Sequence, residues 1–423
     1  MRYLLLLFFL FFISCSNKEV NKEVVEIAPI IKKSINDKNS VHYADFSTYP
    51  SKIDKLPIGI IDLSGSGREM LNAVKSADLV DNISGEYKKD NVRDLEGESF
   101  EVVCDLANFP YSLYLKNDKK DLFRELVVKN ALFLLGKKFY FNTTEMGALG
   151  DKKPCKILIV GDDYFGDIAV NDIKKLLELS KTKVKAVSVM EAGFNALFRD
   201  SLLKRDISVI ALTENVQMDT LYSQYIKKYK YEGDLNFVRE NRTDVAANIY
   251  DLNNLKKISI KEFMKIHLTI LLNKYFITNQ KPIDYIYVGV REYLPIIEDL
   301  NTILNDLRES KDGKGNPIYK SIIPRDIQII NPFKMAAYEC YKELRDSSNL
   351  ALNIYQASDN FYVSVPTLSL TSDLTDSLGN FTNEYKLSRK CGSEENTYVF
   401  LPFSERYINN VNTNWLNTDI STN

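Results

Sequence analysis

The strongest constraint on the fold is a regular alternation of short Val- and Ile-rich runs with longer stretches of helical spacing, starting at residue 56. The runs predicted as strands are 58–62, 100–105, 157–160, 184–189, 207–212, 285–290 and 327–330. The stretches predicted as helices are 121–137, 168–179, 193–203, 260–275 and 293–307. Apolar strands that alternate with helices indicate parallel sheets covered by helices, so we expect an α/β fold. Ligands of such folds bind beyond the carboxyl ends of the strands.

The N-terminus has the pattern of an export signal. Arg2 precedes an unbroken apolar run at 4–13, which is too short to span a bilayer but suits a signal-peptide core. The run leads into Phe-Ile-Ser and then Cys15, which resembles a bacterial lipobox. An ordinary secretory signal with an incidental cysteine is the alternative. We expect residues 1–15 to be a lipoprotein signal peptide and 16–55, rich in Lys, Asn, Asp and Ser, to be a flexible tether.

Lipidation at Cys15 would make the membrane the first partner of the chain. Stable anchoring needs more than one acyl chain, palmitate among them. The predicted location is therefore outside the cytoplasm, on the cell membrane or the outer membrane, facing the periplasm or the cell exterior. The sequence does not identify the membrane or the leaflet.

Charge and residue content exclude several classes of function. The 55 basic and 57 acidic residues nearly balance, and no basic run has interleaved aromatics, so we expect no nucleic-acid partner. The only histidines, His42 and His267, lie far apart, and His267 falls in an apolar helical stretch, which argues against a Ser/His/Asp hydrolase. No Cys pair has metal-ligand spacing, so no metal site is expected. The remaining cysteines, of unknown redox state, are Cys104, Cys155, Cys340 and Cys391.

Two strand ends in the first third of the chain carry polar residues that suit ligand binding. The run 56–67 ends in Asp62, Leu, Ser64, Gly65, Ser, Gly, and a Gly-rich turn lets backbone N–H groups approach a carboxylate. The run 104–112 reads Cys-Asp-Leu-Ala-Asn-Phe-Pro-Tyr-Ser, which contributes Asp105, Asn108 and Tyr111.

Two later strand ends complete the set. The run 159–163 ends in Gly161, Asp162 and Asp163, and the run 288–295 reads Val-Gly-Val-Arg-Glu-Tyr-Leu-Pro. The second run places Val290, then an arginine and a glutamate, directly after a predicted strand.

Together these four strand ends resemble the motifs of the aspartate/glutamate racemase family, in a long glutamate-racemase-like branch, and the resemblance covers roughly 56–406. It implies two similar parallel-sheet α/β domains facing a central cleft. The first would be 56–184, completed by 325–410, the second 185–324, and 411–423 a tail. The segment 213–218 lacks the Thr and Ser of the family's loop, so that part of the resemblance is weak.

The family inverts amino acids without a cofactor, using two cysteines on opposite faces of the substrate. We therefore expect no cofactor in this chain. The resemblance puts the first cysteine at Asp162 (or Gly161 if the register shifts by one), the second at Val290, and an assisting histidine at Glu292. The positions implied for ligand contact are Asp62, Ser64, Gly65, Asp105, Asn108, Tyr111, Asp162, Asp163 and Arg291.

The functional prediction depends on the absence of cysteine at the two positions that the resemblance implies. Stereoinversion needs a titratable group on each face of the reacting carbon, and valine has no proton to exchange. We therefore predict a catalytically inactive racemase homologue that binds a small amino-acid or carboxylate ligand, or a partner protein, near the old cleft. The alternatives are an isomerase that uses carboxylates such as Asp162 and Glu292, and a structural or solute-binding lipoprotein. The sequence leaves a homodimer open.

Overall fold

The computed structural model describes residues 27–63, 65, 67–141, 149–161, 166–199, 206–213, 218–241, 258–279, 281–351, 357–367, 372–376, 379–393 and 397–403. Cys15, Ser64, Asp162 and Asp163 lie outside these ranges, as does the predicted tail. Among the described helices, none combines the length and the apolar character that crossing a membrane requires.

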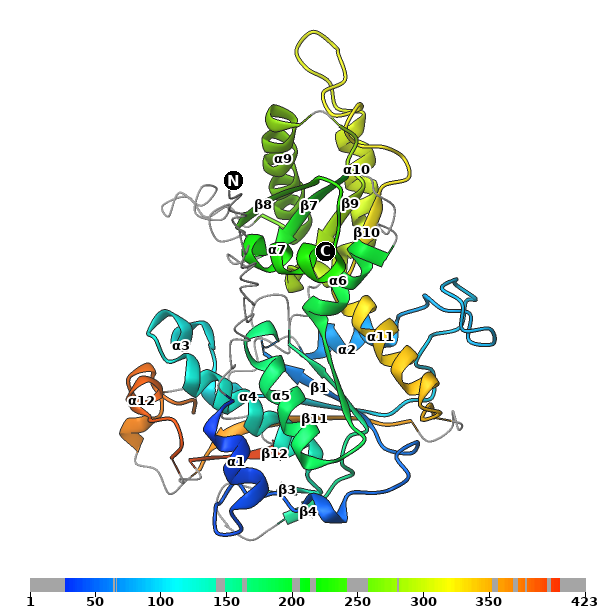
Figure 1. Ribbon diagram of the computed structural model, residues 1–423. Coiled ribbons are helices and arrows are strands. Elements are labelled where there is room, and N and C mark those ends of the chain that lie inside the picture. Colours follow the sequence, from blue (N-terminus) through cyan, green and yellow to red (C-terminus); the bar gives the residue numbers. More distant parts are fainter. Residues whose placement is uncertain are drawn as a thin grey trace, which may run out of the picture.

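The first unit is built on a six-stranded sheet in the order β12-β11-β2-β1-β5-β6 (Figure 1). Its strands are β1 (Ile58–Asp62), β2 (Phe100–Cys104), β5 (Ile157–Val160), β6 (Lys185–Ser188), β11 (Asp359–Pro366) and β12 (Tyr398–Pro402). All neighbours pair in parallel except β12, which runs antiparallel to β11 at the edge. The central strands β1, β2 and β5 are buried along their whole length, as expected for a sheet covered on both faces.

Helices cover both faces of this sheet. One face carries α1 (Pro29–Asn36), α4 (Lys120–Leu135) and α5 (Gly166–Ser180), and the other carries α2 (Gly67–Lys75), α6 (Val189–Arg199) and α11 (Pro332–Asp346). Smaller elements are η1 (Phe46–Thr48), η2 (Leu106–Asn108), α3 (Ser112–Lys116), η5 (Ser372–Leu374), α12 (Asn383–Ser388) and the hairpin of β3 (Lys138–Tyr140) and β4 (Leu149–Asp151).

The second unit has a four-stranded, fully parallel sheet in the order β10-β9-β7-β8. Its strands are β7 (Ile207–Thr213), β8 (Leu235–Asn241), β9 (Tyr285–Val288) and β10 (Gln328–Ile330). Its helices are α7 (Met218–Tyr229), α9 (Ile260–Thr278), η3 (Arg291–Asp299) and α10 (Leu300–Arg308). The prediction of an α/β fold with two parallel-sheet units is confirmed.

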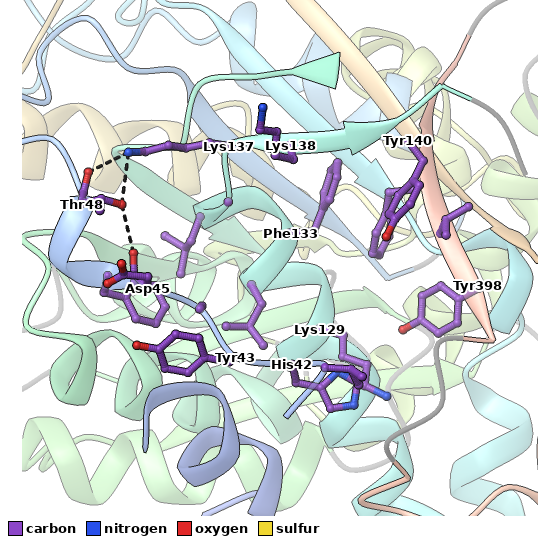
Figure 2. Close-up of a pocket in the computed structure, with 18 of the residues that line it drawn as sticks. His42, Tyr43, Asp45, Thr48, Lys129, Phe133, Lys137, Lys138, Tyr140 and Tyr398 are labelled. Atoms are coloured by element: carbon purple, nitrogen blue, oxygen red, sulfur yellow. Dashed lines mark hydrogen bonds between the residues drawn. The ribbon is translucent and has the colours of Figure 1, made fainter. Parts of the chain in front are cut away.

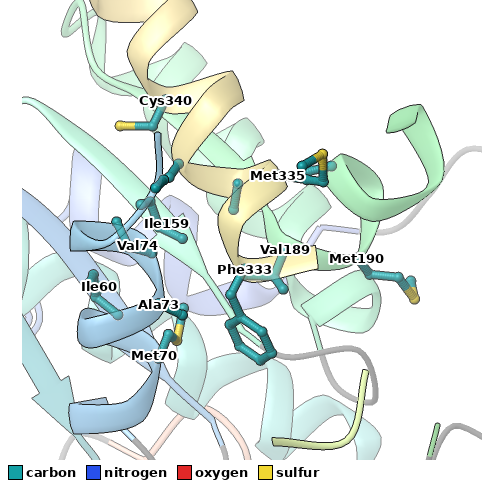
Figure 3. Packing of buried hydrophobic residues seen from close by; sticks show 14 of the residues in the cluster. Ile60, Met70, Ala73, Val74, Ile159, Val189, Met190, Phe333, Met335 and Cys340 are labelled. Carbon is teal, nitrogen blue, oxygen red and sulfur yellow. The ribbon is translucent and has the colours of Figure 1, made fainter. Parts of the chain in front are cut away.

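The two units share one hydrophobic core. Figure 3 shows the part of this core where α2, α6 and α11 meet, with Met70, Val189 and Phe333 among its residues. Residues of β1 such as Ile60 and residues of β7 such as Val209 belong to the same buried cluster, bridged by α6 and α11. Figure 1 shows α2, α6 and α11 between the two sheets. A Cβ at Gly193 on α6 would lie 2.8 Å from the Tyr287 ring and 2.9 Å from Pro332, so only glycine allows this close approach.

Two domain boundaries differ from the prediction. β6 pairs with β5 and so belongs to the first unit, although we placed the boundary at 184/185. β10 pairs with β9 in the second unit, although 325–410 was assigned to the first. The predicted helix 293–307 is instead the 3-10 segment η3 followed by α10, because Pro295 lies inside it and removes a backbone donor.

The prediction of a flexible tether at 16–55 is wrong for residues 27–55. Ile30 and Ile31 of α1 are fully buried against α4 and α5, and the Ala28 amide donates to the Asp172 carboxylate at 2.9 Å. The polar composition concealed the amphipathic helix: Lys32 faces solvent and Lys33 donates to the Gly392 carbonyl oxygen, while two isoleucines fill the buried side. Residues 16–26 lie outside the described ranges.

Candidate functional site

The two units meet near the carboxyl ends of β1 and β9. The helix α2 begins directly after β1, η3 begins directly after β9, and α2 contacts η3. Glu69 on α2 lies within electrostatic range of Arg291 on η3. The motifs at 56–67 and 288–295 therefore come together, as the resemblance implied. The central cleft itself stays a prediction, because 162–165 and 214–217 lie outside the described residues.

Asp62 organises the loop between β1 and α2. Its carboxylate accepts the amide N–H groups of Gly65 and Gly67, each at 2.9 Å, and the thiol of Cys104 at 3.1 Å. Gly65 has a φ of +81°, and a Cβ at Gly67 would approach the Cys104 sulfur to 2.9 Å. The loop amides are thus donated to the protein's own carboxylate. Asp62 is fully buried, and direct ligand contact through it stays a prediction.

Cys104 donates to Asp62 in the loop between β1 and α2, and it is held as a thiol. The side chain is 1% exposed. Burial and the neighbouring Asp62 charge raise the pKa of Cys104 well above its usual value. A thiolate is the reactive form of cysteine, so Cys104 is not prepared as a base or nucleophile. The other described cysteines, Cys155, Cys340 and Cys391, are free as well.

Asp105, Asn108 and Tyr111 form a closed, fully buried network rather than a ligand-facing surface. The Asp105 carboxylate accepts from Asn108 Nδ2 at 2.6 Å, from the Tyr111 hydroxyl at 2.5 Å and from the Ser364 hydroxyl at 2.5 Å. Burial raises the pKa of Asp105, although these donors and Arg389 act in the opposite direction. These three side chains are fully buried among partners of the chain itself, and ligand contact through them stays a prediction.

The run after β9 presents one cation and one acid. Val290 is 1% exposed. The next side chain, Arg291, is about one third exposed, and its Nε donates to the Glu292 carboxylate at 3.2 Å. Burial and the Asp62 charge raise the pKa of Glu69 across the junction, while Arg68 and Arg291 lower it.

Glu69 is the one site residue that the sequence analysis missed. The available signal was its position: Glu69 is an acid in the first turn of α2, the helix that follows the glycine-rich end of β1. The site that the described residues define is therefore Glu69, Arg291 and Glu292. Ser64, Asp162 and Asp163 stay predicted members outside the described ranges.

The two histidines do not join this site. His267 is fully buried, and its ring nitrogens lie 3.0 Å from the Tyr293 hydroxyl and 3.2 Å from the Glu240 carbonyl oxygen. Its prediction as a packed residue is confirmed. His42 lies 3.0 Å from the Ser393 carbonyl oxygen, in the first unit. No group of three or more potential metal ligands occurs within the described residues.

Comparisons with known proteins find similarity in structure alone. No family model and no curated protein matches the chain. A glutamate racemase from Francisella tularensis subsp. tularensis SCHU S4 in complex with D-glutamate is 16% identical, with 73% of this chain and 88% of that one covered and a TM-score of 0.44. Glutamate racemases from Bacillus anthracis (16% identical, coverage 73% and 89%, TM-score 0.42) and Campylobacter jejuni subsp. jejuni (14% identical, coverage 74% and 94%, TM-score 0.41) are also found.

The likeness is one of fold. It carries no conclusion about the ligands or the chemistry of this chain. What this chain can do follows from its own residues at the junction.

Proposed function

We propose that the chain is an exported lipoprotein whose racemase-like body binds a small amino acid where α2 meets η3, and does not invert it. The observation that carries the proposal is the set of groups at this junction. Arg291 is flanked by two acids, Glu69 and Glu292, and Arg68 is a second cation that acts on Glu69. Val290 stands at the strand end where the family motif has a cysteine.

The charge pattern favours a zwitterion over a dicarboxylate. A guanidinium is suited to pair with the α-carboxylate of an amino acid. Glu69 and Glu292 supply acceptors for its ammonium group. A second carboxylate on the ligand would be repelled by these acids, since like charges at short range cost free energy in a partly buried site. We therefore propose neutral amino acids as the ligand class, rather than aspartate or glutamate.

Stereoinversion is disfavoured by the same residues. The reaction needs an acid and a base on opposite faces of the α-carbon, each contributing roughly 10²–10⁴-fold to the rate. Valine contributes neither at position 290, and burial keeps Cys104 protonated. The rival hypothesis, an isomerase that uses carboxylates, draws support from the raised pKa of Glu69, because a poised carboxyl can act as a general base.

Replacing Arg291 tests the binding proposal. We expect Arg291→Gln to weaken binding of a neutral amino acid about tenfold or more, because the ligand carboxylate loses its charged partner. Titration calorimetry with alanine, serine, glutamate and aspartate measures the affinity. Arg93→Gln is the matched control, since Arg93 is exposed and pairs with Glu96 away from the junction. Equal affinities of Arg291→Gln and the unmodified chain would contradict this site.

Exchange of the α-proton separates a binder from an enzyme. In D₂O we expect no incorporation of deuterium into any of the four amino acids above the rate without protein, as followed by NMR. Exchange at an ordinary enzymatic rate would establish the isomerase instead. Absence of calorimetric binding by every amino acid would remove the binding proposal and leave a structural lipoprotein.

The lipid anchor has its own test. We expect Cys15→Ser to abolish metabolic labelling with palmitate and to move the protein from the detergent phase to the aqueous phase in Triton X-114 partitioning, because acyl chains provide the membrane affinity. Cys391→Ser, at an exposed cysteine, is the control. Unchanged labelling of Cys15→Ser would show that the apolar run at 4–13 is not followed by a lipidation site.

A further inference from the structure

A cavity of about 430 Å³ lies in the first unit, lined by residues that take no part in the junction (Figure 2). Its walls come from the segment 41–49, from the last two turns of α4, from β3 and from β12. This volume is in the range that holds a small-molecule ligand. The N-terminal segment forms one wall only because residues 27–55 pack against the body.

The lining is largely apolar and preformed. Phe133 of α4 stacks on Phe400 of β12 with ring centroids 4.3 Å apart, and Tyr398 meets Phe400 edge-on at 5.7 Å. The lining positions on α4 and its C-terminal cap, from Lys129 to Gly136, recur at three- and four-residue spacing and so form one face of the helix. Over seven residues this face is about 10 Å long, which suits an elongated apolar body.

The charges around the cavity are predominantly positive. Three lysines and one acid, Asp45, line it. Lys137 donates to the Thr48 carbonyl oxygen at 2.7 Å and to its hydroxyl at 3.3 Å, both neutral acceptors (Figure 2). Lys129 pairs with Glu125 at 2.8 Å, and Lys138 pairs with Asp151 on the exposed hairpin at 2.5 Å. Both hydrogen-bond acceptors of Lys137 are neutral, and the exposed Asp45 carboxylate acts on it through an electrostatic interaction.

Exposed apolar side chains accompany the cavity. Val41, which lines it, is 49% exposed, and Phe141, next to the lining residue Tyr140, is 48% exposed. Leu149, which pairs with Tyr140 across the hairpin, is 44% exposed. Clustered exposed hydrophobic side chains commonly mark a surface that meets an apolar partner.

We propose that this cavity binds a single-chain amphiphile with one carboxylate, of the fatty-acid type. The acyl chain lies along the face of α4 against Phe133 and Phe400, and the carboxylate pairs with Lys137. Lysine suits this role because its stem covers apolar surface while the ammonium group stays at the edge. The proposal is independent of the junction site, since the two share no residue.

Titration calorimetry of the purified chain with dodecanoate, kept below its micelle concentration, tests the proposal. We expect saturable one-to-one binding, weaker binding of methyl dodecanoate and none of acetate, because both the apolar body and the charge contribute. Lys137→Gln should weaken dodecanoate binding about threefold, the magnitude of one exposed ion pair. Lys320→Gln, an exposed lysine of the second unit, should leave it unchanged.

Filling the cavity provides the decisive variants. Ala44 and Val41 line the cavity, and Ala44→Trp or Val41→Trp should each remove binding while thermal unfolding stays unchanged. The proposal is overturned if dodecanoate shows no saturable binding, if the methyl ester binds as tightly as the carboxylate, or if both folded tryptophan variants retain the affinity of the unmodified chain.

Discussion

Lys156→Met should destabilise the first unit by about 3–5 kcal/mol, a cost expected when one partner of a buried ion pair is removed. Lys156 and Glu98 have side chains 0% and 2% exposed, and their charged atoms lie 2.7 Å apart. Lys156 Nζ also donates to the carbonyl oxygens of Asp54 at 2.9 Å and Asn349 at 2.8 Å. One ammonium group thus connects three distant segments, and methionine of similar length would remove this donor from two carbonyl oxygens and from Glu98 Oε2.

The loss of unfolding free energy in Lys156→Met should grow as pH rises. Burial raises the pKa of Glu98, and Lys156 lowers it, so removal of Lys156 raises it further. A carboxyl with a raised pKa in the folded state contributes stability below its unfolded pKa of about 4.3, and loses it as pH rises through the folded value. The deficit of Lys156→Met relative to the unmodified chain should therefore be larger at pH 8 than at pH 5.

Urea unfolding at both pH values measures this difference. Lys153→Met is the matched control, because Lys153 is exposed three residues away, and we expect a change within about 0.5 kcal/mol. Adding Glu98→Gln to Lys156→Met should recover part of the loss, since glutamine removes the uncompensated charge and keeps an acceptor for the Ala351 amide. A deficit that is equal at the two pH values would show that the charge of Glu98 does not control the effect.

Much of the architecture could be predicted from the sequence, because buried parallel strands leave an uninterrupted Val/Ile signature. Strands β1, β5 and β7 lie where those runs were found. The sheet to which a strand belongs could not be predicted at the unit boundaries. β6 and β10 are short and partly exposed, so their composition does not distinguish one sheet from the other.

The chemistry of the strand ends was harder to predict than their position. The sequence shows that Asp62 and Asp105 follow strands, and polar groups there commonly face a ligand. It does not show that the Asp62 carboxylate accepts hydrogen bonds from its own loop. Nor does it show that the hydroxyl of Ser364, 259 positions further along the chain, donates to Asp105. Hydrogen bonds of such long sequence separation leave no local pattern. The cavity beside α4 was missed for the same reason.

Asp105→Asn should cost about 3 kcal/mol or more, although the two side chains have nearly the same shape. The Asp105 carboxylate receives hydrogen bonds from three groups on two separate segments, all of them donors. An asparagine amide turns one acceptor into a donor and removes the charge, so at least one of these hydrogen bonds is lost or must reverse its direction. Each lost hydrogen bond to a charged group is worth about 1.5–3 kcal/mol.

The charge of Asp105 also acts on Arg389, whose Nη2 donates to Asn108 at 2.5 Å and to the Tyr114 hydroxyl at 2.6 Å. Urea unfolding of Asp105→Asn, Arg389→Met and the double variant therefore forms a cycle that isolates the coupling between the two charges. We expect the double variant to be less destabilised than the sum of the single ones, because it leaves no uncompensated buried charge.

Asp346→Asn, at the exposed end of α11, is the control for the change of aspartate to asparagine. Additive losses in the cycle would mean that Arg389 is held by Asn108 and Tyr114 alone. A neutral Asp105→Asn would mean that the network tolerates an amide in place of the carboxylate. Non-additive losses would mean that the motif at 104–112 serves the stability of the fold. Its acid, Asp105, then holds β11 and the α12 region against the end of β2.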